Sequence, residues 1–83
     1  MKVQVRYFAS IREALGAGES VDVPADITVG GLRDLLIARS AAHAGALARG
    51  RALRCALNQT LCAETVAVLE DAEVAFFPPV TGG

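Results

Sequence analysis

Two runs of alternating residues, one near each end of the chain, constrain the fold most strongly. In residues 2–8, apolar side chains at every second position face one way and the intervening side chains face the other, which is the period of a β-strand with one buried face. Residues 73–77 repeat this pattern. The side chains expected on the buried face are those of Val3, Val5, Tyr7, Val74 and Phe76.

The chain between these two runs predicts one main helix and further short strands. Thr28 can cap a helix with apolar residues at helical spacing, although Gly30 and Gly31 in its first turn lower its propensity. The expected elements, in chain order, are a strand at 2–8, a helical turn from Ser10 to Leu15 with capping-box spacing, a strand at 19–23, a helix from Val29 with Leu32, Leu35 and Leu36 on its core face, a short helix within 40–51, and strands at 53–57, 61–67 and 73–77. This order predicts an α+β fold in which one mixed sheet wraps one main helix.

The charged residues beside these elements are not expected on the core face. Arg33, Asp34 and Arg39 fall outside the apolar stripe of the main helix. The carboxylates near the last turn are scattered and are interpreted as ordinary solvated charges. They are Glu64, Glu70, Asp71 and Glu73.

Alternation also places two phenylalanines on the face of the sheet that points away from the helix. If Tyr7 and Phe76 point toward the helix, their neighbours Phe8 and Phe77 point the other way. Two such side chains on a small domain make an apolar patch that favours an interface. For Phe8, at the end of its strand, burial under a loop is an equal alternative.

Length and composition indicate one small domain. The chain has 83 residues and 53% of them are hydrophobic, which is more than a disordered segment carries. Its net charge is −1 without a basic block, so neither nucleic acid nor an anionic membrane surface is expected as a partner. We find no signal peptide or membrane helix, and we expect a cytoplasmic protein. Residues 1–77 are predicted to form the domain and residues 78–83 an extended tail.

The residue types that usually carry chemistry do not form a site in this sequence. His43 is the only histidine and has no cysteine or paired carboxylate at ligand spacing, so no metal site is predicted. If Asn58-Gln59 is a two-residue turn, Cys55 and Cys62 lie opposite one another. Their Cβ atoms would be about 4.5–5.5 Å apart, beyond the usual disulfide spacing, and we expect two buried, reduced thiols. No segment has the pattern of a nucleotide-binding loop, so we expect this chain to bind no cofactor.

The last residues, Pro78-Pro79-Val80-Thr81-Gly82-Gly83, are the candidate functional segment. The prolines take the chain out of the sheet, and the glycines can enter a slot too narrow for any side chain. A free carboxylate at Gly83 is ionised at neutral pH and is a poor electrophile. It becomes reactive only after another enzyme converts it into a good leaving group.

Together these motifs resemble a known family, the small subunit of molybdopterin synthase, which is a ubiquitin-like sulfur carrier. The resemblance covers the full length of the chain. It rests on Tyr7-Phe8, Ser10-Ile11-Arg12-Glu13, Val29-Gly30-Gly31-Leu32, Asn58-Gln59-Thr60-Leu61 and the run EVAFFPPVTGG at residues 73–83. The last run is the most specific, because a terminal Gly-Gly alone is shared by several ubiquitin-like groups.

The resemblance implies a β-grasp fold and a carrier role. An adenylating enzyme of the ubiquitin-activating type would use ATP to join AMP to the carboxylate of Gly83, and a sulfur donor protein would convert the adenylate into a thiocarboxylate. The carrier would then dock its tail into a pocket of the large synthase subunit, in a heterotetramer, and deliver sulfur to a cyclic pyranopterin phosphate. Gly82 would allow passage through the pocket of that subunit. The partner-binding residues that the resemblance implies are Phe8, Leu61, Phe77, Pro78, Pro79, Val80 and Thr81.

Three other readings stay open. A carrier for thiamine synthesis or RNA thiolation would use the same chemistry with another recipient. A covalent protein tag would form an isopeptide through Gly83, but Lys2 is the only lysine on which a polymer could grow. A plain interaction domain would have an inert tail.

Overall fold

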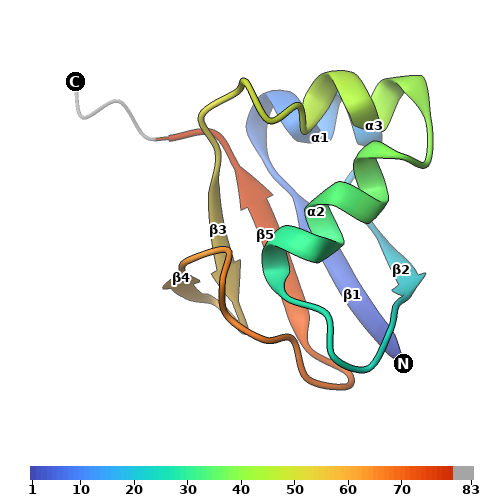
Figure 1. The fold of residues 1–83 in the computed structure, drawn as a ribbon. Helices are drawn as coiled ribbons and strands as arrows, with labels where there is room; N and C mark the ends of the chain where they lie inside the picture. Colours follow the sequence, from blue (N-terminus) through green and yellow to red (C-terminus); the bar gives the residue numbers. More distant parts are fainter. Residues whose placement is uncertain (80–83) are drawn as a thin grey trace.

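The computed structural model describes residues 1–79 as a five-stranded sheet with helices packed on one face (Figure 1). The elements are β1 (Lys2–Tyr7), α1 (Ala9–Leu15), β2 (Gly18–Asp22), α2 (Val29–Ile37), α3 (Ala41–Ala46), β3 (Arg54–Leu57), β4 (Thr60–Cys62) and β5 (Glu73–Phe77). None of the helices in this part of the chain is long and apolar enough to cross a membrane.

The sheet is mixed and its order is β2-β1-β5-β3-β4. β1 pairs antiparallel with β2 and parallel with β5, while β3 pairs antiparallel with β5 and with β4. β5 is therefore the central strand, and it joins the first hairpin to the second. α2 crosses one face of the sheet (Figure 1). The expected α+β fold, with one mixed sheet wrapped around one main helix, is confirmed, and its arrangement is that of the β-grasp.

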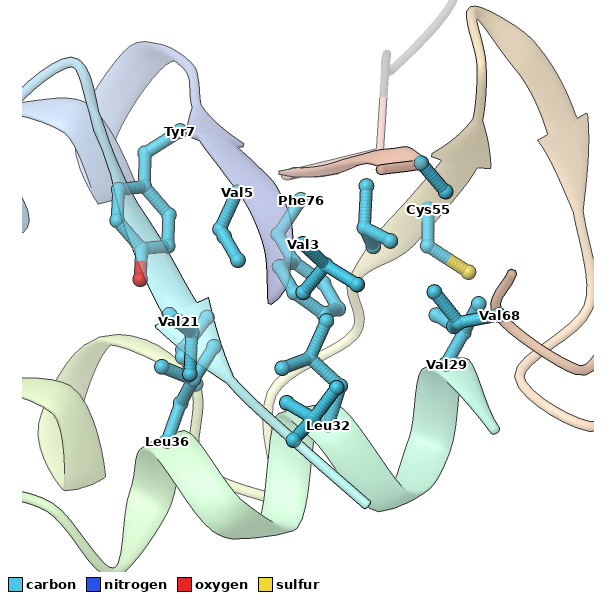
Figure 2. Packing of buried hydrophobic residues seen from close by; sticks show 14 of the residues in the cluster. Val3, Val5, Tyr7, Val21, Val29, Leu32, Leu36, Cys55, Val68 and Phe76 are labelled. Carbon is cyan, nitrogen blue, oxygen red and sulfur yellow. The ribbon is translucent and has the colours of Figure 1, made fainter. Parts of the chain in front are cut away.

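The hydrophobic core fills the space between the sheet and α2 (Figure 2). Both alternating runs send their apolar residues into it, as predicted. The most deeply buried side chains are Val3, Val5, Tyr7, Val21, Val29, Leu32, Leu36, Leu47, Val68, Val74 and Phe76. Burial of each such side chain contributes about 1.5–3 kcal/mol before the entropy of ordering is subtracted.

Helix α1 departs from its predicted start. Phe8, in extended conformation, is the N-cap residue and its side chain makes no capping hydrogen bond. The chain turns from β1 into α1 with no linker, and Ala9 has a positive φ of 54° at that turn. Ser10 consequently lies inside the first turn and does not cap, so the capping-box prediction is wrong. The predicted stop is confirmed, because Gly16 is the C-cap with φ 90°.

Helix α2 begins as predicted, and the structure explains its glycines. The side chain of Thr28 accepts a hydrogen bond from the Gly31 N–H at 3.0 Å. The Gly30 N–H donates to the carbonyl oxygen of Glu64 at 2.8 Å. A Cβ at Gly30 would lie 3.2 Å from that same oxygen. The missing side chain therefore lets the segment after β4 approach the first turn of the helix.

The second hairpin has the predicted turn but a shorter last strand. Asn58 and Gln59 both have positive φ, 49° and 69°, which is the left-handed pair of a two-residue hairpin turn. β4 ends at Cys62, whereas the sequence pattern predicts a strand over 61–67. Beyond it, Ala67 contributes only an isolated bridge to Thr28, because the segment leaves the sheet to pass beside the start of α2.

Candidate docking face and tail

The face of the sheet opposite α2, called the outer face below, carries the apolar side chains expected from alternation. Phe8 is 41% exposed and Leu61 is 59% exposed, while Phe77 is half-buried. No loop among residues 1–79 covers Phe8, so that alternative is wrong for the described chain. Around Phe8, Leu61 and Phe77, the outer face also carries Arg6, Arg54, Ala56 and Ala75.

Strand register brings the two phenylalanines together. β1 and β5 pair Tyr7 with Phe76, and the Phe8 N–H donates to the Phe76 carbonyl oxygen at 3.3 Å. The next residues along each strand, Phe8 and Phe77, therefore lie side by side on the opposite face. On the other side of Phe77 the register places Arg54 of β3.

A second row of the outer face has small residues at its centre. Ala75 lies between Arg6 of β1 and Ala56 of β3, and Ala56 is opposite Leu61 of β4. Both alanines are only 8% exposed although they face away from the core, because the longer side chains around them cover them. The centre of the outer face is thus lined by single methyl groups between larger neighbours.

Two arginines flank the apolar residues of the outer face. The guanidinium carbon of Arg6 lies 6.0 Å from the centroid of the Phe8 ring, within the range of a cation–π contact. Its Nη1 atom is 3.6 Å from Glu73 Oε2, in an exposed pair that contributes little stability. Alternation in the first and last runs already placed Arg6 and Ala75 on this face, without a role, but sequence reasoning missed Arg54 and Ala56. The signal was present, since alternation in β3 puts Arg54 and Ala56 on one face.

The candidate tail begins where the outer face ends. β5 stops at Phe77, and Pro78 and Pro79 follow outside any helix or strand, the first half-buried and the second exposed. The other predicted tail residues lie outside the described residues: Val80, Thr81, Gly82 and Gly83. The chain therefore leaves the sheet at the end of the central strand, next to Phe8 and Arg54 of the outer face (Figure 1). The predicted boundary between domain and tail stays a prediction.

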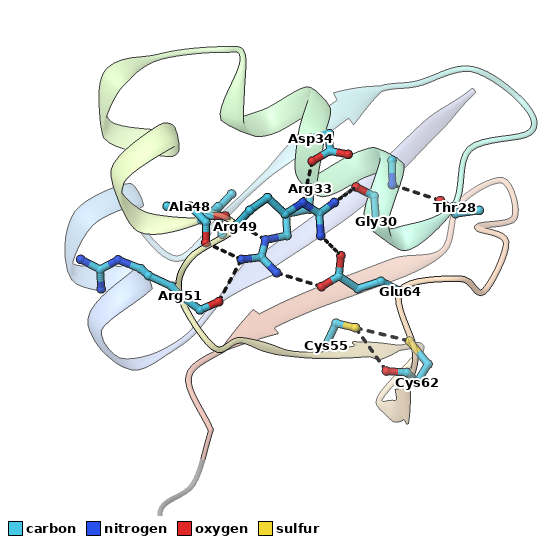
Figure 3. A network of polar contacts seen from close by, with 12 residues as sticks. Thr28, Gly30, Arg33, Asp34, Ala48, Arg49, Arg51, Cys55, Cys62 and Glu64 are labelled. Carbon is cyan, nitrogen blue, oxygen red and sulfur yellow. Dashed lines mark hydrogen bonds and ion pairs between the residues drawn. The ribbon is translucent and has the colours of Figure 1, made fainter.

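A buried arginine ties the second hairpin to α2 (Figure 3). Arg33 is 3% exposed, although it falls outside the apolar stripe of the main helix. Its Nε donates to the Leu47 carbonyl oxygen at 2.8 Å, and its Nη2 donates to those of Ala48 at 2.6 Å and Arg51 at 3.2 Å. Its Nη1 pairs with Glu64 Oε2 at 2.8 Å. The guanidinium thereby holds both the segment that enters β3 and Glu64, two residues after the end of β4.

Arg49 reinforces this connection from outside. Its Nε donates to Asp34 Oδ1 and its Nη2 to the Gly30 carbonyl oxygen, both at 2.8 Å, and its Nη1 pairs with Glu64 Oε1. The hydrogen bond from Arg49 holds the pKa of Asp34 below its ordinary value. Burial alone would raise the pKa of Glu64, but the two arginines outweigh it and lower that pKa. Glu64 is therefore not the ordinary solvated charge expected from its surroundings in the sequence.

The carboxylate of Glu19 lies between β1 and α3 and contacts His43, the only histidine of the chain. Glu19 Oε2 accepts a hydrogen bond from the Tyr7 hydroxyl at 2.8 Å and lies 2.8 Å from His43 Nε2. Glu19 Oε1 accepts from Arg39 at 2.6 Å, and Ser40 Oγ is 2.7 Å from His43 Nδ1. His43 is half-buried and its ring contacts structural partners on both sides. Within residues 1–79, no three His, Cys, Asp or Glu side chains are grouped to hold a metal ion.

The two cysteines lie opposite one another in β3 and β4, which confirms the pairing expected from the turn. Both are free, and Cys55 is buried. Cys62 is only half-buried, so the expectation that both thiols are buried is wrong. The reason is that β4 is a short edge strand with one neighbour.

Comparison with known proteins assigns the chain to a family. The sequence model of the ThiS family matches residues 5–83. The chain belongs to the ThiS family. Its relatives include the molybdopterin synthase sulfur carrier subunit of Escherichia coli (strain K12), which is 44% identical over 82 residues, 98% of this chain and 99% of that protein. The resemblance drawn from the motifs is thereby confirmed.

Solved structures similar to this ThiS-family chain share its fold. Small archaeal modifier protein 1 of Haloferax volcanii matches with a TM-score of 0.77 and 29% identity, over 95% of this chain and 98% of that one. A chain from the protein–protein complex of subunits 1 and 2 of the molybdopterin-converting factor from Helicobacter pylori 26695 matches with a TM-score of 0.70 and 25% identity, over the full length of both chains.

Proposed function

We propose that this ThiS-family chain is a sulfur carrier in molybdenum cofactor biosynthesis and acts as the small subunit of a molybdopterin synthase. The match to the Escherichia coli sulfur carrier subunit over 98% of the chain carries the proposal. The run EVAFFPPVTGG supports it, because Phe77, at the end of β5, pairs next to the exposed Phe8 of the outer face.

The working group is the carboxylate of Gly83. A ubiquitin-activating-type enzyme transfers AMP from ATP to this carboxylate and releases pyrophosphate. A sulfur nucleophile from a donor protein then attacks the acyl carbon and AMP leaves, so that a thiocarboxylate remains. ATP belongs to the activating enzyme, and the carrier itself binds no cofactor. The carrier alone is not catalytic. Its role is to carry the sulfur and to deliver it to cyclic pyranopterin monophosphate.

The large synthase subunit covers the outer face in this proposal. Phe8, Leu61 and Phe77 supply apolar contacts, and burying such exposed side chains on a partner is the main source of affinity in an interface. The tail from Pro78 to Gly83 then extends into the pocket of that subunit, with Gly82 passing its narrowest part. The Helicobacter pylori complex joins subunits 1 and 2 of a molybdopterin-converting factor, which supports such a pairing. We place this assembly in the cytoplasm, with the ATP-dependent activating enzyme.

The intact mass of the chain tests the carrier role. After incubation with ATP, the activating enzyme and a sulfur source, the chain should gain the mass difference between one sulfur and one oxygen atom. Omission of ATP, or a variant lacking Gly82-Gly83, should abolish the gain. A complete system that leaves the mass unchanged would overturn the proposal.

A second candidate, attachment to other proteins through Gly83, is favoured by the similarity to small archaeal modifier protein 1. An epitope-tagged chain expressed in cells distinguishes it. A set of larger conjugates that disappears when Gly82-Gly83 is deleted would support attachment, while a single band at the size of the free chain would contradict it.

A further inference from the structure

Cys55 and Cys62 form a cross-strand pair of thiols at the edge of the sheet (Figure 3). Their Sγ atoms are 3.9 Å apart, and the Cys62 thiol donates toward Cys55 Sγ. The Cys55 thiol donates to the carbonyl oxygen of Cys62 at 3.2 Å. Each thiol is therefore in contact with the other residue, and the pair is already assembled.

We propose that this pair is a dithiol site, which a two-electron oxidant converts into a reversible intramolecular disulfide. Opposed Cα atoms in an antiparallel ladder are about 4.5–5.5 Å apart, within the range of about 4.4–6.8 Å that disulfides span. Opposed Cβ atoms, at about 4.5–5.5 Å, exceed the separation of about 3.5–4.5 Å in relaxed disulfides. The two strands must draw together, so the bond forms under strain and is readily reduced, as a reversible site requires.

The oxidation removes two protons and two electrons from the pair. The Cys62 thiolate attacks the N=N bond of the azo oxidant diamide and forms a sulfur–nitrogen adduct. The Cys55 sulfur then displaces the reduced hydrazine and forms the sulfur–sulfur bond, and its proton goes to the departing nitrogen. Cys62 reacts first because it is only half-buried, whereas Cys55 is 6% exposed.

The protonation of Cys55 fits this order of events. Burial, followed by the neighbouring Cys62, raises the pKa of Cys55 to about 11. Cys55 therefore remains a thiol at neutral pH while Cys62 reacts. It then resolves the adduct at Cys62 as its proton passes to the departing nitrogen.

The strand that moves on oxidation is β4. It has three residues and pairs only with β3, at the end of the sheet order. Cys55 is part of the buried core, so Cys62 must move toward it. Leu61 precedes Cys62 and points to the outer face, so the same movement displaces a side chain of the docking surface. This consequence, unlike the disulfide itself, rests on the proposed function.

The disulfide is tested on the full-length chain. The reduced protein is treated with diamide, denatured, alkylated with N-ethylmaleimide and weighed intact. The expected product has lost two hydrogen atoms and takes up no maleimide, and dithiothreitol restores two alkylation sites. The Cys62→Ser variant, treated in the same way, should lose no hydrogen and take up one maleimide. Two maleimides on the oxidant-treated wild type, or disulfides only between chains, would overturn the proposal.

The coupling to Leu61 is tested by affinity for the large synthase subunit. We expect the oxidised chain to bind about tenfold more weakly than the reduced chain, as when an interface contact is lost, and we expect the oxidant to leave the affinity of Cys62→Ser unchanged. Equal affinity of both wild-type forms would disprove the coupling. Failure of the reduced chain to bind would contradict the proposed function and leave the disulfide, which is read from mass, standing.

Discussion

The Nε atom of Arg33 donates to the carbonyl oxygen of Leu47 at 2.8 Å, and this contact joins the main helix to an irregular segment 14 residues further along the chain. The same guanidinium reaches Ala48, Arg51 and Glu64. Backbone carbonyls outside helices and strands need other partners when they are buried. Arg33 supplies these partners where the chain enters β3.

Replacing Arg33 with methionine should lower the free energy of unfolding by about 3 kcal/mol, because three backbone carbonyls lose their side-chain donor and Glu64 keeps only its pair with Arg49. Arg33→Lys should lose about 1–2 kcal/mol, since one ammonium cannot reproduce the planar fork. Urea unfolding measures both. The matched control is Arg12→Met, which changes an exposed side chain on α1. Its free energy of unfolding is expected within about 0.5 kcal/mol of wild type. Equal stability of Arg33→Met and Arg12→Met would refute the role of the network.

Two helical glycines should respond in opposite directions to alanine. At Gly45 in α3 a Cβ has nothing within 4 Å, so Gly45→Ala should raise the free energy of unfolding by about 0.5–1 kcal/mol. At Gly30 a Cβ meets Glu64 Oε1 at 3.1 Å and its carbonyl oxygen at 3.2 Å. Gly30→Ala should therefore destabilise the protein by about 1 kcal/mol. Thermal and urea melts of the two variants compare them directly, and stabilisation by both would show that the contact with Glu64 is loose.

Acidification should weaken the fold through Glu19. Burial alone would raise the pKa of Glu19, but the hydrogen bonds from His43 and Tyr7, with the charges of His43 and Arg39, outweigh it and lower that pKa. A carboxylate with a lowered folded-state pKa stabilises the protein above its unfolded-state value of about 4.3. That stability is lost as the pH falls through the folded-state pKa.

Urea unfolding of wild type and Glu19→Gln, from neutral pH down to pH values below the folded-state pKa of Glu19, checks this expectation. The variant should be less stable than wild type at neutral pH, and the gap should close in acid. Glu13→Gln, which removes an exposed carboxylate on α1, is the matched control. A gap that stays constant at all pH values would show that the charge of Glu19 is irrelevant.

A carboxylate at Leu61 should disrupt docking without disturbing the fold. Leu61 is 59% exposed on the outer face, and Leu69 is 72% exposed in the turn before β5. Leu61→Asp should weaken binding to the large synthase subunit by about tenfold or more, because it buries a charge in an apolar contact. Leu69→Asp should bind as wild type. Calorimetric titration measures both affinities, and an equal loss in the two variants would remove the outer face from the interface.

The buried faces of β1 and β5 were predictable because only one register of each strand buries its apolar side chains. Once every second side chain is apolar, a shift by one residue would expose the whole set, so the buried residues of β1 and β5 follow from the sequence. The Asn58-Gln59 turn then sets the register of Cys55 against Cys62. By the same logic Phe8 and Phe77 were correctly placed on the outer face.

Long-range polar contacts were not predictable from local patterns. The carbonyls that bury Arg33 belong to an irregular segment whose path no periodicity encodes. The same holds for Glu64, whose neighbours on α2 are far away in the sequence. Ser10 shows the opposite failure, because the capping spacing is present but the sharp turn at Ala9 starts the helix too early. The functional roles of Phe8, Leu61, Phe77 and the tail stay predictions.

The central position of β5 in the sheet also determines when the chain can complete its fold during synthesis. The two hairpins that flank it share no ladder with each other, so they join into one sheet only when residues 73–77 pair with both. During synthesis the ribosome delivers these residues last among the strands. A nascent chain therefore emerges with its sheet divided, and the native fold closes only when the segment that leads into the tail has cleared the exit tunnel.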